Sequence, residues 1–146
     1  MTEKKRVLIL CTGNSARSQM AEGLLRHLAG DRFEVFSAGV APSFVRPQAI
    51  EVMSEIGIDI SQHRSKSVDE FLDEQLEYVI TVCDHASRRC PVSPAAVERI
   101  HWSIDDPVVG GSEEMQLEAF RRARDELQRR IQRFVDDLAP TLAESD

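Results

Sequence analysis

The feature that most constrains the fold is a short loop between an apolar run and a helical pattern. Residues 7–10 (Val-Leu-Ile-Leu) form a continuous apolar run, which is typical of a strand buried on both faces. After the small and polar residues 12–15, apolar residues recur at helical spacing, at Met20, Leu24, Leu25 and Leu28. A buried strand that passes through a short loop into a helix predicts the first unit of a parallel α/β sheet.

The rest of the chain repeats this alternation of strand and helix. Further strands are expected at residues 33–38, 78–83 and 97–104. A helix is expected to begin at Pro47 and to end before Gly57. The last helix carries an apolar stripe of Phe120, Ala123, Leu127, Ile131, Phe134 and Leu138. The pattern predicts an α/β fold, a three-layer αβα sandwich with a four-stranded parallel sheet, in a single domain over residues 1–146.

The composition narrows the class of function. The 18 basic and 25 acidic residues give a formal net charge of -7, whereas nucleic-acid binders usually carry a basic excess. The apolar run at residues 7–10 is too short for a signal peptide, and no stretch approaches the length of a membrane span. We therefore expect a cytoplasmic monomer without nucleic-acid or membrane partners. The 3 cysteines, an odd number in a reducing compartment, favour reactive thiols over a permanent disulfide framework.

The loop at residues 11–18 (Cys-Thr-Gly-Asn-Ser-Ala-Arg-Ser) carries the first chemical signal. Backbone amides of a loop between a strand and a helix point into one concavity, where the helix dipole also favours an anion. We expect Gly13 to permit the unusual backbone angles of such a loop, and Arg17 to donate two hydrogen bonds to a tetrahedral anion. The predicted oxyanion-binding residues are Thr12, Gly13, Asn14, Ser15, Ala16 and Arg17.

These surroundings should also lower the pKa of the Cys11 thiol and make Cys11 a nucleophile. The Ser18 hydroxyl is placed to hydrogen-bond its sulfur. The alternative is a buried cysteine and a surface arginine that are six apart by chance. The glycine, the two serines and the strand–loop–helix context argue against that alternative.

Residues 83–90 (Cys-Asp-His-Ala-Ser-Arg-Arg-Cys) carry the second signal. Residues seven apart on a helix are roughly 10 Å apart, whereas a disulfide needs Cα atoms closer than about 7 Å. A Cys83–Cys90 disulfide would therefore unwind this segment. Two other interpretations stay open: Cys83 is a small core residue and Cys90 a spectator, or both bind zinc with His85, although a fourth ligand is missing. We expect ordinary surface or packing roles otherwise for the histidines, His27, His63, His85 and His101.

The Cys-x5-Arg-Ser loop resembles that of the low-molecular-weight protein tyrosine phosphatases. Residues 11–22 as a whole resemble, more specifically, the thioredoxin-coupled arsenate reductases of that superfamily. The similarity continues up to the final helix, through residues 37–39, 57–63, 82–83, 90–91 and 101–107.

This resemblance implies that the protein reduces arsenate to arsenite through three cysteines. Cys11 attacks arsenate, Cys83 attacks Cys11, Cys90 attacks Cys83, and thioredoxin reduces the final disulfide. It also assigns the proton donor to Asp106, which by itself is more typical of an Asp-Pro turn with no chemistry. The implied catalytic residues are Cys11, Arg17, Ser18, Cys83, Cys90 and Asp106, with no bound cofactor and no metal site.

The sequence departs from its relatives at two positions of this site. Ala16 stands where relatives often have a cysteine, a change that removes a thiol the cascade does not need. Some relatives bind potassium behind the loop through residues that match Asn14, Glu22 and Ser37, and through an aspartate where this chain has Lys66. We therefore expect Asn14, Glu22, Ser37 and Lys66 to support the loop without a requirement for potassium.

Two other functions compete with arsenate reduction. A true tyrosine phosphatase usually carries aromatic residues after the acid, where this chain has Val108 and Val109, and it has no use for Cys90. Weak residual phosphatase activity is compatible with the same loop. A non-catalytic oxyanion sensor would not need the nucleophile, the arginine and the acid together.

Overall fold

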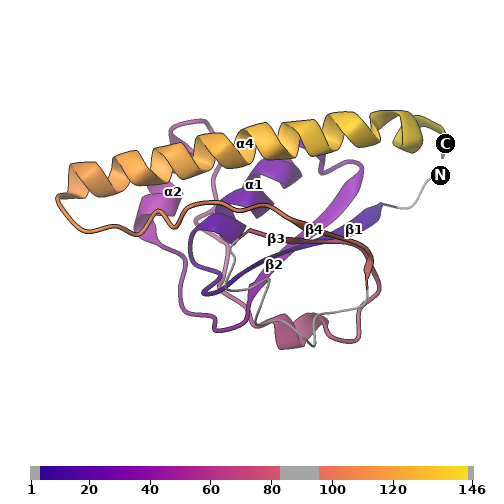
Figure 1. Ribbon diagram of the computed structural model, residues 1–146, viewed down its shortest axis with the longest axis horizontal. Coiled ribbons are helices and arrows are strands. Elements are labelled where there is room, and N and C mark those ends of the chain that lie inside the picture. The colour runs from indigo at the N-terminus through magenta and orange to yellow at the C-terminus, as the bar shows by residue number, and fades with distance from the viewer. Residues whose placement is uncertain (1–3, 83–95, 145–146) are drawn as a thin grey trace.

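The sheet holds four parallel strands. The computed structural model describes residues 4–82 and 96–144 of the chain (Figure 1). Strands β2 (Phe33–Gly39), β1 (Lys5–Cys11), β3 (Leu76–Thr81) and β4 (Ala96–His101) lie side by side in that order, and each neighbouring pair is parallel. The predicted four-stranded parallel sheet is therefore confirmed.

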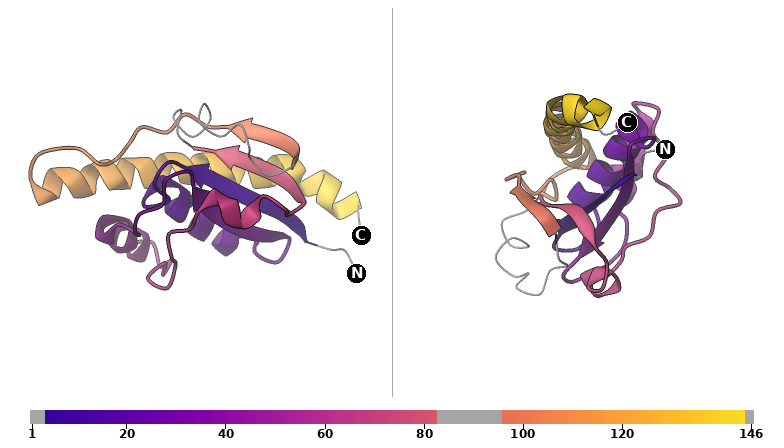
Figure 2. Two further views of the ribbon diagram at one scale, coloured as in Figure 1. Left: turned by 90° about the horizontal axis from the view of Figure 1, so that it is seen from below. Right: turned by 90° about the vertical axis from the view of Figure 1, so that its right-hand side faces the viewer.

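In the part of the chain that the structure describes, three α-helices pack together on one face of this sheet. They are α1 (Arg17–Ala29), α2 (Pro47–Ser54) and α4 (Glu113–Glu144), and α4 lies against both α1 and α2. Figure 2 shows α1 and α4 on one side of the sheet, with the short 3-10 helix η1 (Val68–Phe71) on the other. In residues 4–82 and 96–144, no helix is long and apolar enough to cross a membrane.

The apolar run in β1 explains why helices can pack on both faces of the central strand. Val7, Ile9 and Cys11 belong to the core cluster under α1 and α4. Leu8 and Leu10 point to the opposite face, toward Val68 and Phe71 of η1. Side chains alternate across a strand, so a continuous apolar run is buried on both sides.

Two strand boundaries differ from the prediction in a way that shapes the site. β3 ends at Thr81 rather than at residue 83, and β4 ends at His101 rather than at residue 104. Beyond β4, the Ile104 carbonyl accepts a hydrogen bond from Nη1 of Arg17 at 2.8 Å. The chain therefore turns toward the loop after β1 instead of continuing the strand.

Candidate active site

Cys11 is the last residue of the central strand β1, at the edge where the parallel strands end. It is 3% exposed and pairs in register with Gly39, the last residue of β2. A Cβ on Gly39 would lie 2.6 Å from the Thr12 carbonyl oxygen and 2.8 Å from the Asn14 amide nitrogen. Only glycine allows the loop to come this close to β2. Ligands of open α/β sheets bind at this edge.

The backbone carbonyls of residues 11–16 all accept hydrogen bonds from behind or beside the loop. Five of the six carbonyls accept from a backbone amide, and the Asn14 carbonyl accepts from Gln19 Nε2. The distances are 2.8 to 3.3 Å, and the donors in the order of the carbonyls are Val40, Ala41, Ser43, Gln19, Arg46 and Met20. The Gly13 carbonyl also accepts from the Ser43 and Ser65 hydroxyls. The described residues contain no cis peptide bond. In a trans peptide the N–H points away from the carbonyl, so the amides of residues 12–17 face the opposite side. They form a concavity at the N-terminus of α1, which suits an anion. Residues 11–17 are called the anion loop below.

The left-handed residue of the anion loop is Asn14, with φ of 47°, and not Gly13. The expected role of Gly13 is therefore wrong, because its φ is not positive and an added Cβ would meet its nearest neighbours at 3.4 Å. Asparagine tolerates this conformation better than most residues when its short side chain finds local partners. Here Asn14 Nδ2 donates to Ser18 Oγ at 2.8 Å and to Ser37 Oγ at 3.0 Å.

Arg17 joins the anion loop to the segment that carries the expected acid. Besides its hydrogen bond to the Ile104 carbonyl, its Nη2 lies 4.0 Å from Asp106 Oδ2. The Arg17 side chain is 12% exposed and that of Asp106 is 62% exposed. Asp106 Oδ1 accepts a hydrogen bond from the Val108 amide at 2.9 Å. The fold therefore brings Cys11, Arg17 and Asp106 to one edge of the sheet, with the carboxylate at the solvent side.

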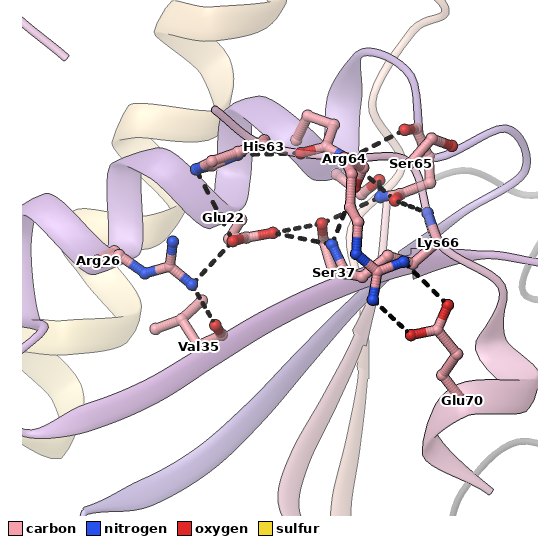
Figure 3. Close-up of polar contacts among 12 residues, drawn as sticks. Glu22, Arg26, Val35, Ser37, His63, Arg64, Ser65, Lys66 and Glu70 are labelled. Atoms are coloured by element: carbon pink, nitrogen blue, oxygen red, sulfur yellow. Dashed lines mark hydrogen bonds and ion pairs between the residues drawn. The ribbon is translucent and has the colours of Figure 1, made fainter. Parts of the chain in front are cut away.

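The predicted supporting residues form a buried polar cluster behind the anion loop. Ser37 Oγ donates to Glu22 Oε1 at 2.5 Å, and Lys66 Nζ lies 3.9 Å from the same oxygen (Figure 3). The Lys66 side chain is only 12% exposed, so it does not point into solvent. Its backbone amide donates to Asn14 Oδ1 at 2.8 Å. Burial lowers the pKa of Lys66, and the Glu22 carboxylate opposes this shift.

Sequence reasoning missed four residues of this cluster. Arg26 Nη2 lies 2.8 Å from Glu22 Oε2, and Ser65 Oγ donates to the Gly13 carbonyl. Gln19 donates to Asn14, and His63 Nδ1 lies 3.0 Å from Gln19 Oε1. His63 was expected to have an ordinary surface or packing role, and its side chain is indeed packed, 11% exposed, between Gln19 and Glu22, but the sequence did not reveal these two partners. The one sequence feature that could have indicated a role for any of them is that Gln19 lies inside the motif of residues 11–22.

The second cysteine segment lies outside the described residues. Cys83 and Cys90, with His85 between them, fall in residues 83–95. The structure therefore does not test the predicted cysteine relay or the predicted unwinding of this segment. The zinc alternative likewise stays a prediction.

The chain is similar to known proteins over most of its length. A family model described as "Low molecular weight phosphotyrosine protein phosphatase" matches residues 6–144. An arsenate reductase of Halalkalibacterium halodurans is 46% identical over 134 residues, which are 91% of this chain and 96% of that protein.

Solved structures with the same fold include reductases. One described as "An arsenate reductase in the phosphate binding state" is 33% identical with a TM-score of 0.78, and the match covers 91% of this chain and 98% of that one. A thioredoxin-dependent arsenate reductase of Corynebacterium glutamicum is 28% identical with a TM-score of 0.72. That match covers 99% of this chain and 65% of the other.

Proposed function

This chain belongs to the low molecular weight phosphotyrosine protein phosphatase family, and within that family we propose that it reduces arsenate to arsenite. The observation that carries the proposal is the anion loop. Its carbonyls are turned outward, its amides face a concavity, and Cys11 ends the strand that leads into it. The names of relatives such as the Halalkalibacterium halodurans protein support arsenate as the oxyanion.

The proposed reaction begins with the Cys11 thiolate, which attacks arsenic and forms a sulfur–arsenic bond. Asp106 donates a proton to the departing oxygen, which leaves as water. Cys83 then attacks the Cys11 sulfur. The sulfur–arsenic electron pair stays on arsenic, which is reduced from the pentavalent to the trivalent state and leaves as arsenite.

The remaining steps restore the enzyme. Cys90 attacks Cys83, which releases the Cys11 thiolate and moves the disulfide to Cys83–Cys90. Thioredoxin supplies two thiols and leaves with the disulfide. The thioredoxin-dependent relative from Corynebacterium glutamicum supports this choice of reductant. The scheme needs a reducing compartment, so the proposal includes a cytoplasmic location.

A phosphatase is the second candidate, because the family model carries that name. Two features favour the reductase. The residues after Pro107 are the exposed aliphatic Val108 and Val109, which offer no aromatic face to a substrate ring. Phosphate esters are also hydrolysed without any use for Cys90.

The proposal is tested by coupling the protein to thioredoxin, thioredoxin reductase and NADPH. We expect NADPH oxidation that depends on arsenate and yields one arsenite per NADPH. Phosphate should inhibit competitively because it has the same shape and charge. Rapid hydrolysis of an aryl phosphate, with no arsenate-dependent NADPH oxidation, would identify a phosphatase instead.

The Cys90→Ser variant is expected to complete a single turnover with arsenate and then stop. Its Cys11 can still attack arsenic and its Cys83 can still release arsenite, but the disulfide cannot move away from Cys11. Rapid-quench measurement of arsenite per enzyme, with and without thioredoxin, checks this prediction. Normal steady-state turnover of Cys90→Ser with thioredoxin would rule out the relay and show that thioredoxin reduces the Cys11–Cys83 disulfide directly.

We further propose that the Lys66 ammonium takes the place of a bound cation behind the anion loop. The Glu22 carboxylate is 5% exposed, and burying such a charge without a partner is costly. Arg26 and Lys66 both approach this carboxylate, at 2.8 and 3.9 Å. Lys66 Nζ also donates to the Arg64 carbonyl at 3.0 Å, which holds the long side chain in place.

Activity of the unmodified protein should therefore not change when potassium replaces sodium at constant ionic strength. Lys66→Asp restores an oxygen ligand beside Asn14, Glu22 and Ser37, and it should make kcat/KM dependent on potassium. Lys66→Met is the matched control, because it removes the charge without adding a ligand and should lower activity equally in both salts. Clear potassium activation of the unmodified protein would contradict the proposal.

A further inference from the structure

The Asn14 carbonyl is held differently from the other carbonyls of the anion loop. Each of the others accepts from a backbone amide, so its direction follows from the path of the chain, and the Ser43 and Ser65 hydroxyls add to the amide at Gly13. The Asn14 carbonyl accepts from a side chain, Nε2 of Gln19, at 3.1 Å. The N–H of the same peptide belongs to Ser15 and points the opposite way, into the concavity. The direction of the Ser15 amide therefore depends on the Gln19 side chain.

Gln19 is built rigidly into this position. It is 0% exposed, and its Nε2 lies within hydrogen-bond distance of three oxygens. Besides the Asn14 carbonyl, these are Asn14 Oδ1 at 2.9 Å and the Arg64 carbonyl at 3.0 Å. Asn14 has a positive φ of 47°, a conformation that persists in a non-glycine residue only when its surroundings hold it. Gln19 therefore hydrogen-bonds both the main-chain carbonyl and the side-chain oxygen of Asn14.

His63 determines which way the Gln19 amide faces. Because Nε2 faces three oxygens, Oε1 of Gln19 must be the atom that faces His63 Nδ1 at 3.0 Å. An amide oxygen only accepts, so Nδ1 must carry the proton. Burial lowers the pKa of His63, against the opposing effect of the Glu22 carboxylate, and so favours the neutral ring. Its other nitrogen, Nε2, lies 3.8 Å from Glu22 Oε2, which is too far for a hydrogen bond.

We propose that Gln19 is a positioning residue for the oxyanion: its amide holds the Asn14–Ser15 peptide so that the Ser15 N–H faces the anion, and His63 orients that amide. The inference rests on the proposed function, because the anion is the substrate of that reaction. Loss of the Gln19 donor would let this one peptide rotate while Cys11 and Arg17 keep their places. The oxyanion should then bind more weakly, and the structural change should be confined to the Asn14–Ser15 peptide.

The test compares Gln19→Met with the unmodified protein. Methionine has nearly the length and volume of glutamine but donates no hydrogen bond. We expect the dissociation constant for inorganic phosphate, measured by calorimetry, to rise roughly tenfold or more. In amide NMR spectra, phosphate should still shift the Gly13 resonance but no longer the Ser15 resonance. Gln132→Met makes the same chemical change on the exposed face of α4 and should change neither measurement.

Phosphate binding does not depend on arsenic chemistry, so this result is independent of the proposed activity. A chain that reduces no arsenate but loses phosphate affinity and the Ser15 response in Gln19→Met would still support the positioning role. Phosphate binding within about twofold of the unmodified protein, or equal loss at Gly13 and Ser15, would overturn it. If Gln19→Met does not fold, His63→Phe keeps the glutamine and frees its amide. That variant should bind phosphate roughly threefold more weakly, and unchanged binding would overturn the proposal.

Discussion

The Cys11→Ser variant is expected to form no arsenite from arsenate in the presence of thioredoxin and NADPH. A hydroxyl is a far weaker nucleophile than a thiolate at neutral pH, and an oxygen cannot take part in the disulfide that carries electrons to arsenic. The loss in kcat should exceed about 10⁴-fold, as when other enzymes lose their nucleophile. Hydrolysis of an aryl phosphate, if the unmodified protein has any, should disappear in parallel.

The same variant should still bind phosphate, which separates chemistry from recognition. The concavity is made by backbone amides and by Arg17, and the substitution touches neither of them. Calorimetric binding of inorganic phosphate to Cys11→Ser should therefore stay within about threefold of the unmodified protein. Arsenite formation by Cys11→Ser at an undiminished rate would show that another group attacks arsenic and would remove Cys11 from the mechanism.

The sequence predicted the scaffold well because its signals are local. Residues 7–10 are apolar on both faces, and they form the central part of β1 with core on either side. Pro47 begins α2 as expected. The end of β4 was predicted three residues too late. The Ile104 carbonyl instead accepts a hydrogen bond from Arg17, a residue 87 positions earlier in the chain, and local sequence patterns do not report such a contact.

The loop's internal conformation was harder to predict, because distant segments determine it. A glycine is the obvious candidate for an unusual backbone angle, and Gly13 was chosen on that ground. The left-handed residue is Asn14, which is held by Gln19, by Ser37 of β2 and by the backbone of Lys66. The role of His63 likewise depends on contacts with α1, 44 positions away from it at Gln19. No periodicity or spacing reports such contacts.

The Arg17→Lys variant is expected to lose about 10²- to 10³-fold in kcat/KM for arsenate, although the positive charge is kept. A guanidinium can hold the Ile104 carbonyl with one nitrogen and still present donors to an oxyanion and to Asp106. The donors of a lysine ammonium all sit on one nitrogen atom, which cannot reach the Ile104 carbonyl, the oxyanion and Asp106 at the same time. The segment carrying Asp106 would then lose its tether to the anion loop, so the proton donor and the nucleophile would no longer be fixed relative to each other.

Two comparisons separate this geometric loss from a loss of charge or of stability. Arg17→Met removes the charge as well, and it should reduce phosphate affinity further than Arg17→Lys does. Arg129→Lys makes the same exchange on α4, where the side chain is 69% exposed, and it should leave kcat/KM unchanged. The melting temperature of Arg17→Lys should fall by only a few degrees, because one hydrogen bond contributes about 1 kcal/mol. If Arg17→Lys retained kcat/KM within about threefold, charge alone would suffice, and the link from Arg17 to Ile104 and Asp106 would have no part in catalysis.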